Sequence, residues 1–139
     1  MSTIEEELQL LAAAAKPLQQ ATDEANAAIQ AANAGIAATA PGIEIWLSDP
    51  EGKPLLLGNA ASEIGYRACL GVDKVKSAWQ VVYQAFHVGE RVGDVHPLAE
   101  ASREVRLEAA VLLPELIRAL TNECHRLLKI SRGAAGKVP

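Results

Sequence analysis

The sequence predicts an α+β fold in two layers: a long N-terminal helix, a three-stranded antiparallel meander and a long C-terminal helix. Three observations support this prediction. Apolar and small residues recur with a period of 3.5 over residues 4–36. A period of two follows in segments between residues 43 and 88, and a helical spacing returns over residues 103–129. Since 50% of the 139 residues are hydrophobic, we expect one buried core and a single domain over residues 1–130.

The N-terminal helix is predicted from one unbroken apolar stripe. Its members follow at alternating steps of four and three residues: Ile4, Leu8, Leu11, Ala15, Leu18, Thr22, Ala25, Ile29, Ala32 and Ile36. Ser2 or Thr3 can cap the start, and the glutamates at positions 5–7 complement the positive end of the helix dipole. Pro17 removes an amide donor, so we expect a kink or a break there.

The length of this helix raises the question of a second chain. Thirty-three helical residues span roughly 50 Å, which is more than the width of roughly 35–40 Å expected for a compact domain of this size. Either the helix folds back near Pro17, or its end overhangs and meets another copy. We expect the second arrangement, a homodimer.

Three strands are expected in the middle of the chain, at residues 43–47, about 63–70 and about 77–88, where apolar and polar side chains alternate. The sequence Asp-Pro-Glu-Gly at residues 49–52 predicts a turn. Three leucines at positions 55–57 predict either a short strand or a plug in the core. The connecting segments are expected to be a polar reversal at residues 72–76 and a loop at residues 89–97.

A second long helix is predicted over residues 103–129, with Ser102 as its cap and a kink at Pro114. Its buried stripe comprises Val105, Ala109, Leu112, Leu113, Leu116, Leu120, Cys124 and Leu127. Residues 131–139 are rich in glycine and alanine, which predicts a flexible tail.

Composition argues against several classes of protein. The net charge of −4 argues against general nucleic-acid binding, which usually requires a basic field. The apolar run at residues 8–15 follows three glutamates, the wrong charge for a signal peptide, and the polar residues within residues 25–43 argue against a membrane span. Cys69 and Cys124 lie far apart without metal-binding spacing, which is typical of reduced cysteines in a cytoplasmic protein.

No motif for catalysis or cofactor binding is present in the sequence. His87, His96 and His125 are too widely spaced to form a helical or strand metal pair. The glycines form no phosphate-binding loop, and no nucleophile motif occurs. His96 and Asp94 could form an acid/base pair, but a polar turn is the better interpretation of these neighbours. We therefore expect no catalytic residue, no metal and no cofactor.

Two functional hypotheses remain. The first is a non-enzymatic protein-binding or accessory module that uses an uncovered sheet face or the overhanging end of the N-terminal helix. Its candidate residues are Trp46, Arg67, Trp79 and Tyr83. Trp79 and Tyr83 could instead belong to the sheet core or to a dimer contact, because the sequence leaves open which sheet face the helices cover. The second hypothesis is a small-molecule sensor or small enzyme with a pocket between helices and sheet, lined by Tyr66, Cys69 or His96.

Residues 57–120 resemble a group of short bacterial α+β proteins of unassigned function. The similarity consists of a Gly-Tyr strand, a Trp strand and a closing helix with the pattern ASRE and LPEL. The matching residues are Gly65, Tyr66, Trp79, Pro97, Leu98, Ser102, Arg103, Arg106, Glu108, Ala109, Pro114 and Leu116. The resemblance implies the same fold and a bacterial or phage-derived, cytosolic origin, and it assigns no functional residue.

In size, acidity and expected dimerisation the chain is also similar to type III secretion chaperones. These small α/β proteins hold an unfolded effector segment along their surface, which illustrates how a module of this kind could work. The chain departs from their pattern because no strand is predicted after its last helix.

Overall fold

The computed structural model describes residues 2–39, 41–58 and 67–136. It confirms the predicted α+β order of long helix, antiparallel sheet and long helix. The elements are α1 (Ile4–Thr39), β1 (Ile45–Trp46), β2 (Leu56–Leu57), β3 (Arg67–Val75), β4 (Ala78–His87), β5 (Glu90–Pro97), the 3-10 helix η1 (Leu98–Glu100) and α2 (Arg103–Gly136). Within the described part of the chain the sheet has five strands, in place of the three predicted.

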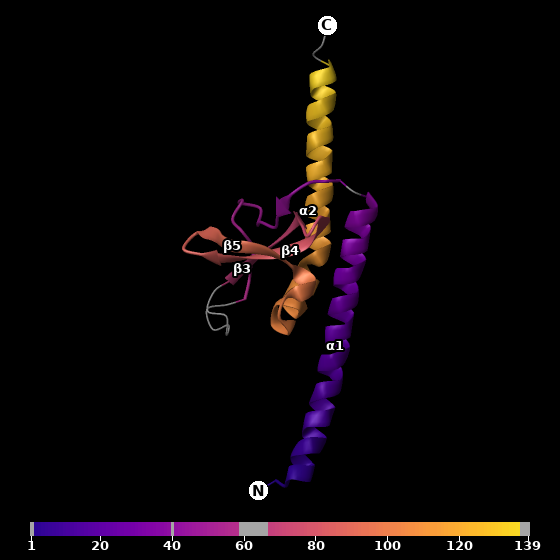
Figure 1. The fold of residues 1–139 in the computed structure, drawn as a ribbon, viewed down its shortest axis with the longest axis vertical. Helices are drawn as coiled ribbons and strands as arrows, with labels where there is room; N and C mark the ends of the chain where they lie inside the picture. Colours follow the sequence, from indigo (N-terminus) through magenta and orange to yellow (C-terminus); the bar gives the residue numbers. More distant parts are fainter. Residues whose placement is uncertain (1, 40, 59–66, 137–139) are drawn as a thin grey trace.

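α1 is one continuous helix that passes through Pro17 with a shallow curve and without the expected break (Figure 1). Pro17 lies on an exposed stretch of helix, where water can bond the carbonyl group that a proline leaves without a donor. Thr3 provides the cap, since its Oγ1 accepts a hydrogen bond of 3.2 Å from the backbone N–H of Glu6.

Two of the predicted connections between strands are wrong. Residues 72–75, expected to be a reversal, belong to β3, and the turn occurs at Lys76 and Ser77, whose φ angles are 53° and 64°. Two central residues with positive φ match the twist of a two-residue hairpin. Residues 90–97, expected within a loop, form β5 and pair with β4. Residues 63–66 of the second predicted strand lie outside the described residues.

The short strands form the opposite edge of the sheet. β1 and β2 both pair with β3, and the chain between them turns at Asp49–Gly52, where the N–H of Gly52 donates to the carbonyl of Asp49 over 3.0 Å. The predicted turn is therefore confirmed. Leu57 lies in β2 with only 1% of its surface exposed, so the leucine segment is both a short strand and part of the core.

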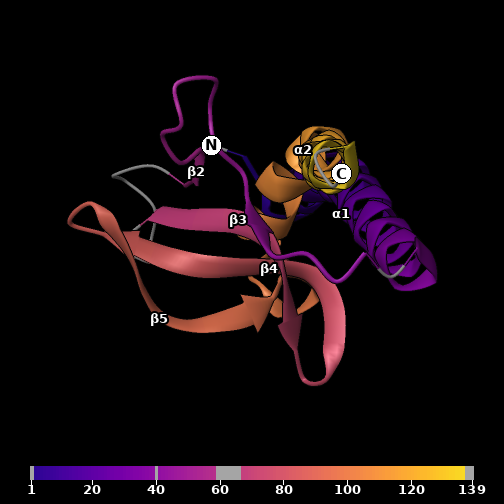
Figure 2. The same ribbon diagram turned by 90° about the horizontal axis from the view of Figure 1, so that it is seen from above.

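Both long helices pack against one face of the sheet (Figure 2). Register places Leu70 opposite Tyr83 and Val72 opposite Val81, and these residues face the helices. The helices lie side by side and run in the same direction (Figures 1 and 2). The buried residues of this core are Ile29, Ile36, Leu47, Leu57, Ala68, Leu70, Val72, Val81, Leu98, Ala101, Val105, Ala109, Leu113, Leu116 and Leu120.

α1 also closes part of the edge of β4. β5 pairs with β4 only from Val82 onward, which leaves the preceding residues of β4 without that neighbour. The side-chain oxygen of Asn33 accepts a hydrogen bond of 2.8 Å from the backbone N–H of Val81. A side chain of α1 thus satisfies a backbone donor that a further strand would otherwise take.

α2 begins where predicted and ends later than predicted. Ser102 caps it, with its Oγ accepting from the N–H of Val105 over 3.4 Å, and the helix continues through Pro114. It extends past residue 129 to Gly136, so it includes part of the segment expected to be a flexible tail.

Each helix extends beyond the sheet, at opposite ends of the molecule (Figure 1). Every residue from 4 to 21 is exposed, and Thr22 is the first buried residue of α1; we call residues 4–21 the α1 arm. Leu120 is the last buried residue among the side chains of α2 whose placement is described (residues 103–133), and residues 121–136 form the α2 arm. Among the described residues, no helix is apolar enough over a sufficient length to cross a bilayer.

The other sheet face depends on close packing at Gly71. A Cβ atom at this position would lie 2.5 Å from the carbonyl oxygen of Ile45 and 2.6 Å from Cε3 of Trp46. The Trp46 ring therefore packs directly on the backbone of β3, and only glycine leaves room for it.

We predict that Gly71→Ala destabilises the fold by about 1–3 kcal/mol, the usual cost of overpacking. Trp46 emission, measured in a Trp79→Phe background, should shift to the red as the ring leaves its site. Gly35→Ala is the control, because a Cβ there meets nothing within 4 Å and alanine favours a helix by about 0.5–1 kcal/mol. Equal stability of the two variants in urea would contradict the packing described.

Candidate functional site

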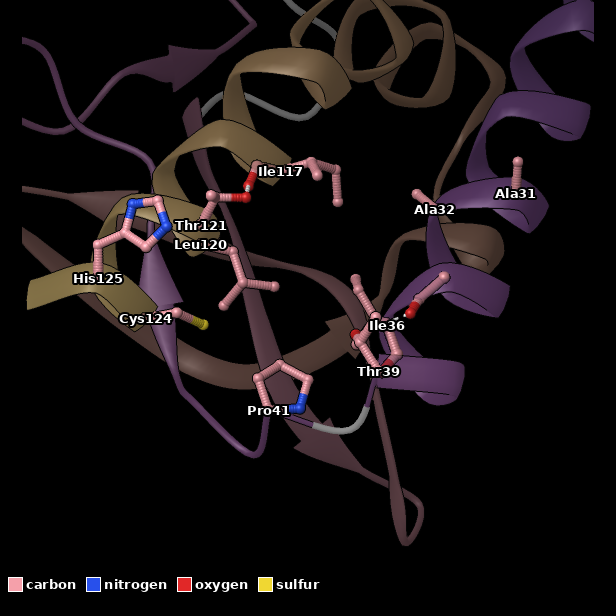
Figure 3. A pocket seen from close by; sticks show the side chains of 11 residues that line it. Ala31, Ala32, Ile36, Thr39, Pro41, Ile117, Leu120, Thr121, Cys124 and His125 are labelled. Atoms are coloured by element: carbon pink, nitrogen blue, oxygen red, sulfur yellow. Dashed lines mark hydrogen bonds between the residues drawn. The ribbon is translucent and has the colours of Figure 1, made fainter. Parts of the chain in front are cut away.

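A groove with apolar walls opens between the C-terminal end of α1 and α2 (Figure 3). Its volume is about 440 Å³. One wall consists of small residues of α1, and Gly35 lacks any neighbour that its Cβ would meet. The groove is therefore a place where the two helices leave space between them. It is lined by Ala31, Ala32, Gly35, Ile36, Thr39, Pro41, Ile117, Leu120, Thr121, Cys124 and His125.

The two hydroxyl groups in the groove are both used by their own helices. Thr39 Oγ1 donates to the carbonyl oxygen of Gly35 over 2.9 Å. Thr121 Oγ1 donates to the carbonyl oxygen of Ile117 over 3.0 Å. Because these donors are satisfied, the walls offer mainly carbon surface, which suits an apolar ligand or side chain.

Cys124 and His125 are the polarisable and titratable groups of the groove. Cys124 is half-buried and its thiol points between the helices, whereas His125 is exposed and lies toward the edge (Figure 3). The lining includes no carboxylate and no lysine or arginine. Within the described residues, no cluster of three His, Cys, Asp or Glu side chains could hold a metal ion. The described lining is therefore mainly apolar, with one thiol and one imidazole at neighbouring positions of α2.

Past the groove, the α2 arm exposes further apolar side chains. α1 ends at Thr39, but α2 continues and presents three large apolar side chains that are 41% (Leu127), 45% (Leu128) and 56% (Ile130) exposed. Arg126, Lys129 and Arg132 make the same arm basic. Glu123 is bound by Arg126, and this hydrogen bond lowers the pKa of the glutamate.

The face of the sheet away from the helices carries two of the predicted binding residues, and both are engaged within the chain. The Trp46 ring lies between Gly71 and Arg91, whose guanidinium carbon is 4.2 Å from the ring centroid, and its Nε1 donates to Glu44 over 3.1 Å. Arg67 donates to the carbonyl oxygens of Gly58 and Leu56 over 3.1 and 3.0 Å, and so holds β2 against β3.

The other two predicted binding residues lie on the helix-covered face. Trp79 and Tyr83 are half-buried and pack against the core, and the ring of Tyr83 lies 5.5 Å from that of His96. The structure therefore divides the four candidates between two faces and does not bring them together. Of the residues of the second hypothesis, Tyr66 lies outside the described residues, and strand register puts Cys69 and His96 on opposite faces.

Comparisons of this chain with protein-family models, with curated proteins and with solved structures each gave no match. The resemblance of residues 57–120 to short bacterial proteins stays a prediction.

The buried thiol of Cys69 should make the stability of the fold depend on pH. Burial raises the pKa of its thiol, and Arg91 opposes this effect without cancelling it. The thiol of an unfolded cysteine has a pKa of about 8.5. Above that pH the unfolded chain therefore releases a proton that the folded chain retains. Stability contributed by this group is present below about pH 8.5 and falls as the pH rises further.

Urea unfolding at about pH 7 and about pH 9.5, on either side of the pKa of an unfolded thiol, should show this loss in the wild type and a smaller one in Cys69→Val. Cys124→Val is the control and should behave as the wild type does. Identical pH dependence in the wild type and Cys69→Val would contradict the role given to burial.

Proposed function

We propose that the protein is a non-enzymatic protein-binding module that receives an amphipathic helix of its partner along the α2 arm, with the groove at the foot of that arm. The observation that carries the proposal is that the apolar stripe of α2 continues past the end of α1, and no described residue covers it. Helices laid into apolar grooves are a recurring mode of peptide recognition.

The internal packing of the chain supports this arrangement. Beside the sheet, Ile29 and Ile36 of α1 belong to the same buried cluster as Leu113, Leu116 and Leu120 of α2. Beyond Thr39 this covering helix is missing, while α2 extends to Gly136. A partner helix in line with α1 would cover the exposed leucines, and burial of apolar surface yields about 25 cal/mol per Å².

Charge indicates the chemistry of the partner. The described part of the arm carries three basic side chains, Arg126, Lys129 and Arg132, and one carboxylate, Glu123. Glu123 pairs with Arg126, so the arm has a surplus of two positive charges. A partner helix with an apolar stripe and flanking carboxylates fits this surface. Attraction between such exposed charges weakens with added salt.

The experiment is capture of the partner from a lysate of the source organism with tagged protein. Replacing Leu127 and Leu128 by glutamine should reduce capture roughly tenfold or more, because it removes the apolar contact on the side of α2 that continues the groove. Val111→Gln is the matched control: Val111 is 77% exposed on α2 and turned away from the stripe. Equal capture by the double variant and the control would overturn the proposal, as would the absence of any partner with fixed stoichiometry.

The volume of the groove favours a second candidate, a sensor for a small apolar molecule. About 440 Å³ lies within the range of roughly 300–1,000 Å³ typical of ligand pockets. In this case the groove itself is the binding site, and the α2 arm plays no part in ligand recognition.

A thermal-unfolding screen with apolar metabolites tests this second candidate. A ligand at about one hundred times its Kd should add about 2.7 kcal/mol of stability. Gly35→Leu places a side chain in the open space of the groove and should abolish the shift. If no compound stabilises the wild type, or if Gly35→Leu responds equally, the groove is not a small-molecule site.

A further inference from the structure

We propose that two copies of this chain pair through their α1 arms, which lie antiparallel about a two-fold axis at Ala13. The contact uses the α1 arm and the start of α2, and it involves no residue of the α2 arm. It therefore stands or falls separately from the partner-binding role proposed for the α2 arm.

The α1 arm exposes the same stripe that the rest of the helix buries. Ile4 is 79% exposed, Leu8 56%, Leu11 60% and Leu18 42%, whereas Ala25, Ile29 and Ile36 further along the same stripe are almost completely buried. The stripe does not change character between the two halves. The two halves differ in the element beside them. α2, which begins at Arg103, covers the second half of the stripe and does not reach the α1 arm.

The position at which α2 begins determines how much of the α1 stripe is covered. Arg106, in the first turns of α2, donates a hydrogen bond from Nη1 to Asn26 Oδ1 of α1. The residues of α1 before Thr22 therefore extend past the beginning of α2 (Figure 1). Their stripe continues the side of α1 on which Ile29 and Ile36 pack in the core, so it faces the space in line with α2. This space is as long as the arm, roughly 27 Å at 1.5 Å per residue.

The α1 arm of a second copy fills this space when the two arms are aligned in one particular antiparallel register. With the axis at Ala13, Leu8 lies opposite Leu18 and Leu11 opposite Ala15, so that exposed stripe residues of the two arms meet. Ile4 reaches the level of Thr22, where the buried part of the other α1 begins. The run of alanines at positions 12–15 lies at the axis, where small side chains allow the helices to approach closely. The contact is the same on both copies, so it closes as a dimer and does not extend into a fibre.

Charge at the tip of the arm favours a second copy as the occupant. The antiparallel register carries Glu5, Glu6 and Glu7 to the level of Ala21, Gln20 and Gln19 in the other copy, one to two helical turns before Asn26, which contacts the start of its α2. There the arm meets the positive end of a helix dipole together with Arg103 and Arg106. Of the acidic side chains near that level, Asp23 and Glu24 accept hydrogen bonds from Gln19 and Gln20 of their own helix. Glu104, in the first turn of α2, is two residues before Arg106 and therefore lies on the opposite side of α2 from the Arg106 contact with α1.

The first experiment is sedimentation velocity of the full chain over a series of concentrations. We expect a dimer for the wild type, and a dissociation constant raised roughly tenfold or more for the variant with Leu8→Gln and Leu11→Gln. Leu10→Gln is the matched control, since Leu10 is 64% exposed on the same arm and turned off the stripe. None of these residues touches the core, and circular dichroism verifies that each variant keeps its helices.

Disulfide trapping in a Cys124→Ser background tests the register. An equimolar mixture of Leu8→Cys and Leu18→Cys chains should form cross-linked dimers with oxidised glutathione, and either variant alone should not. A monomeric wild type, an equal loss of dimer in the Leu10→Gln control, or cross-linking of Leu8→Cys with itself would overturn the proposal. A monomeric chain that still captures a partner through its α2 arm would overturn this inference and leave the proposed function standing.

Discussion

The structure depends on the burial of one apolar stripe of α1 against α2 and the sheet. Ile29 and Ile36 insert between the two other elements, in the cluster that holds Val81 and Leu116. This contact makes the two long helices run side by side in the same direction. It also decides which sheet face is covered, and it forces the surplus length of each helix to opposite ends of the molecule (Figure 1).

The second sheet face is closed by different means, without a layer of helices. Trp46 covers Gly71, Arg91 covers Trp46, and Glu44 accepts a hydrogen bond from the indole. Aromatic surface that could have served as a binding platform is thus already occupied by the chain itself. The larger apolar side chains that remain exposed belong mainly to the two helix arms.

Periodicity predicted both helices because amphipathic spacing is a local property of the chain. It could not predict what covers each stripe, so Leu127 was expected to be buried and is 41% exposed. β5 was missed because its exposed edge position allows polar residues such as Arg91 and Asp94, which give little apolar alternation. The groove could not be predicted from Ala32 or Gly35 alone, since small residues signal close packing as readily as open space.

The hydrogen bond from Val81 to Asn33 has a consequence for solubility. Unpaired strand edges are templates on which other chains add strands and aggregate. At the beginning of β4, α1 blocks this edge and a side-chain amide takes the place of the incoming strand. The helix that organises the core therefore also prevents other chains from adding strands at this edge. If α1 detached locally, the beginning of β4 would be exposed to neighbouring molecules.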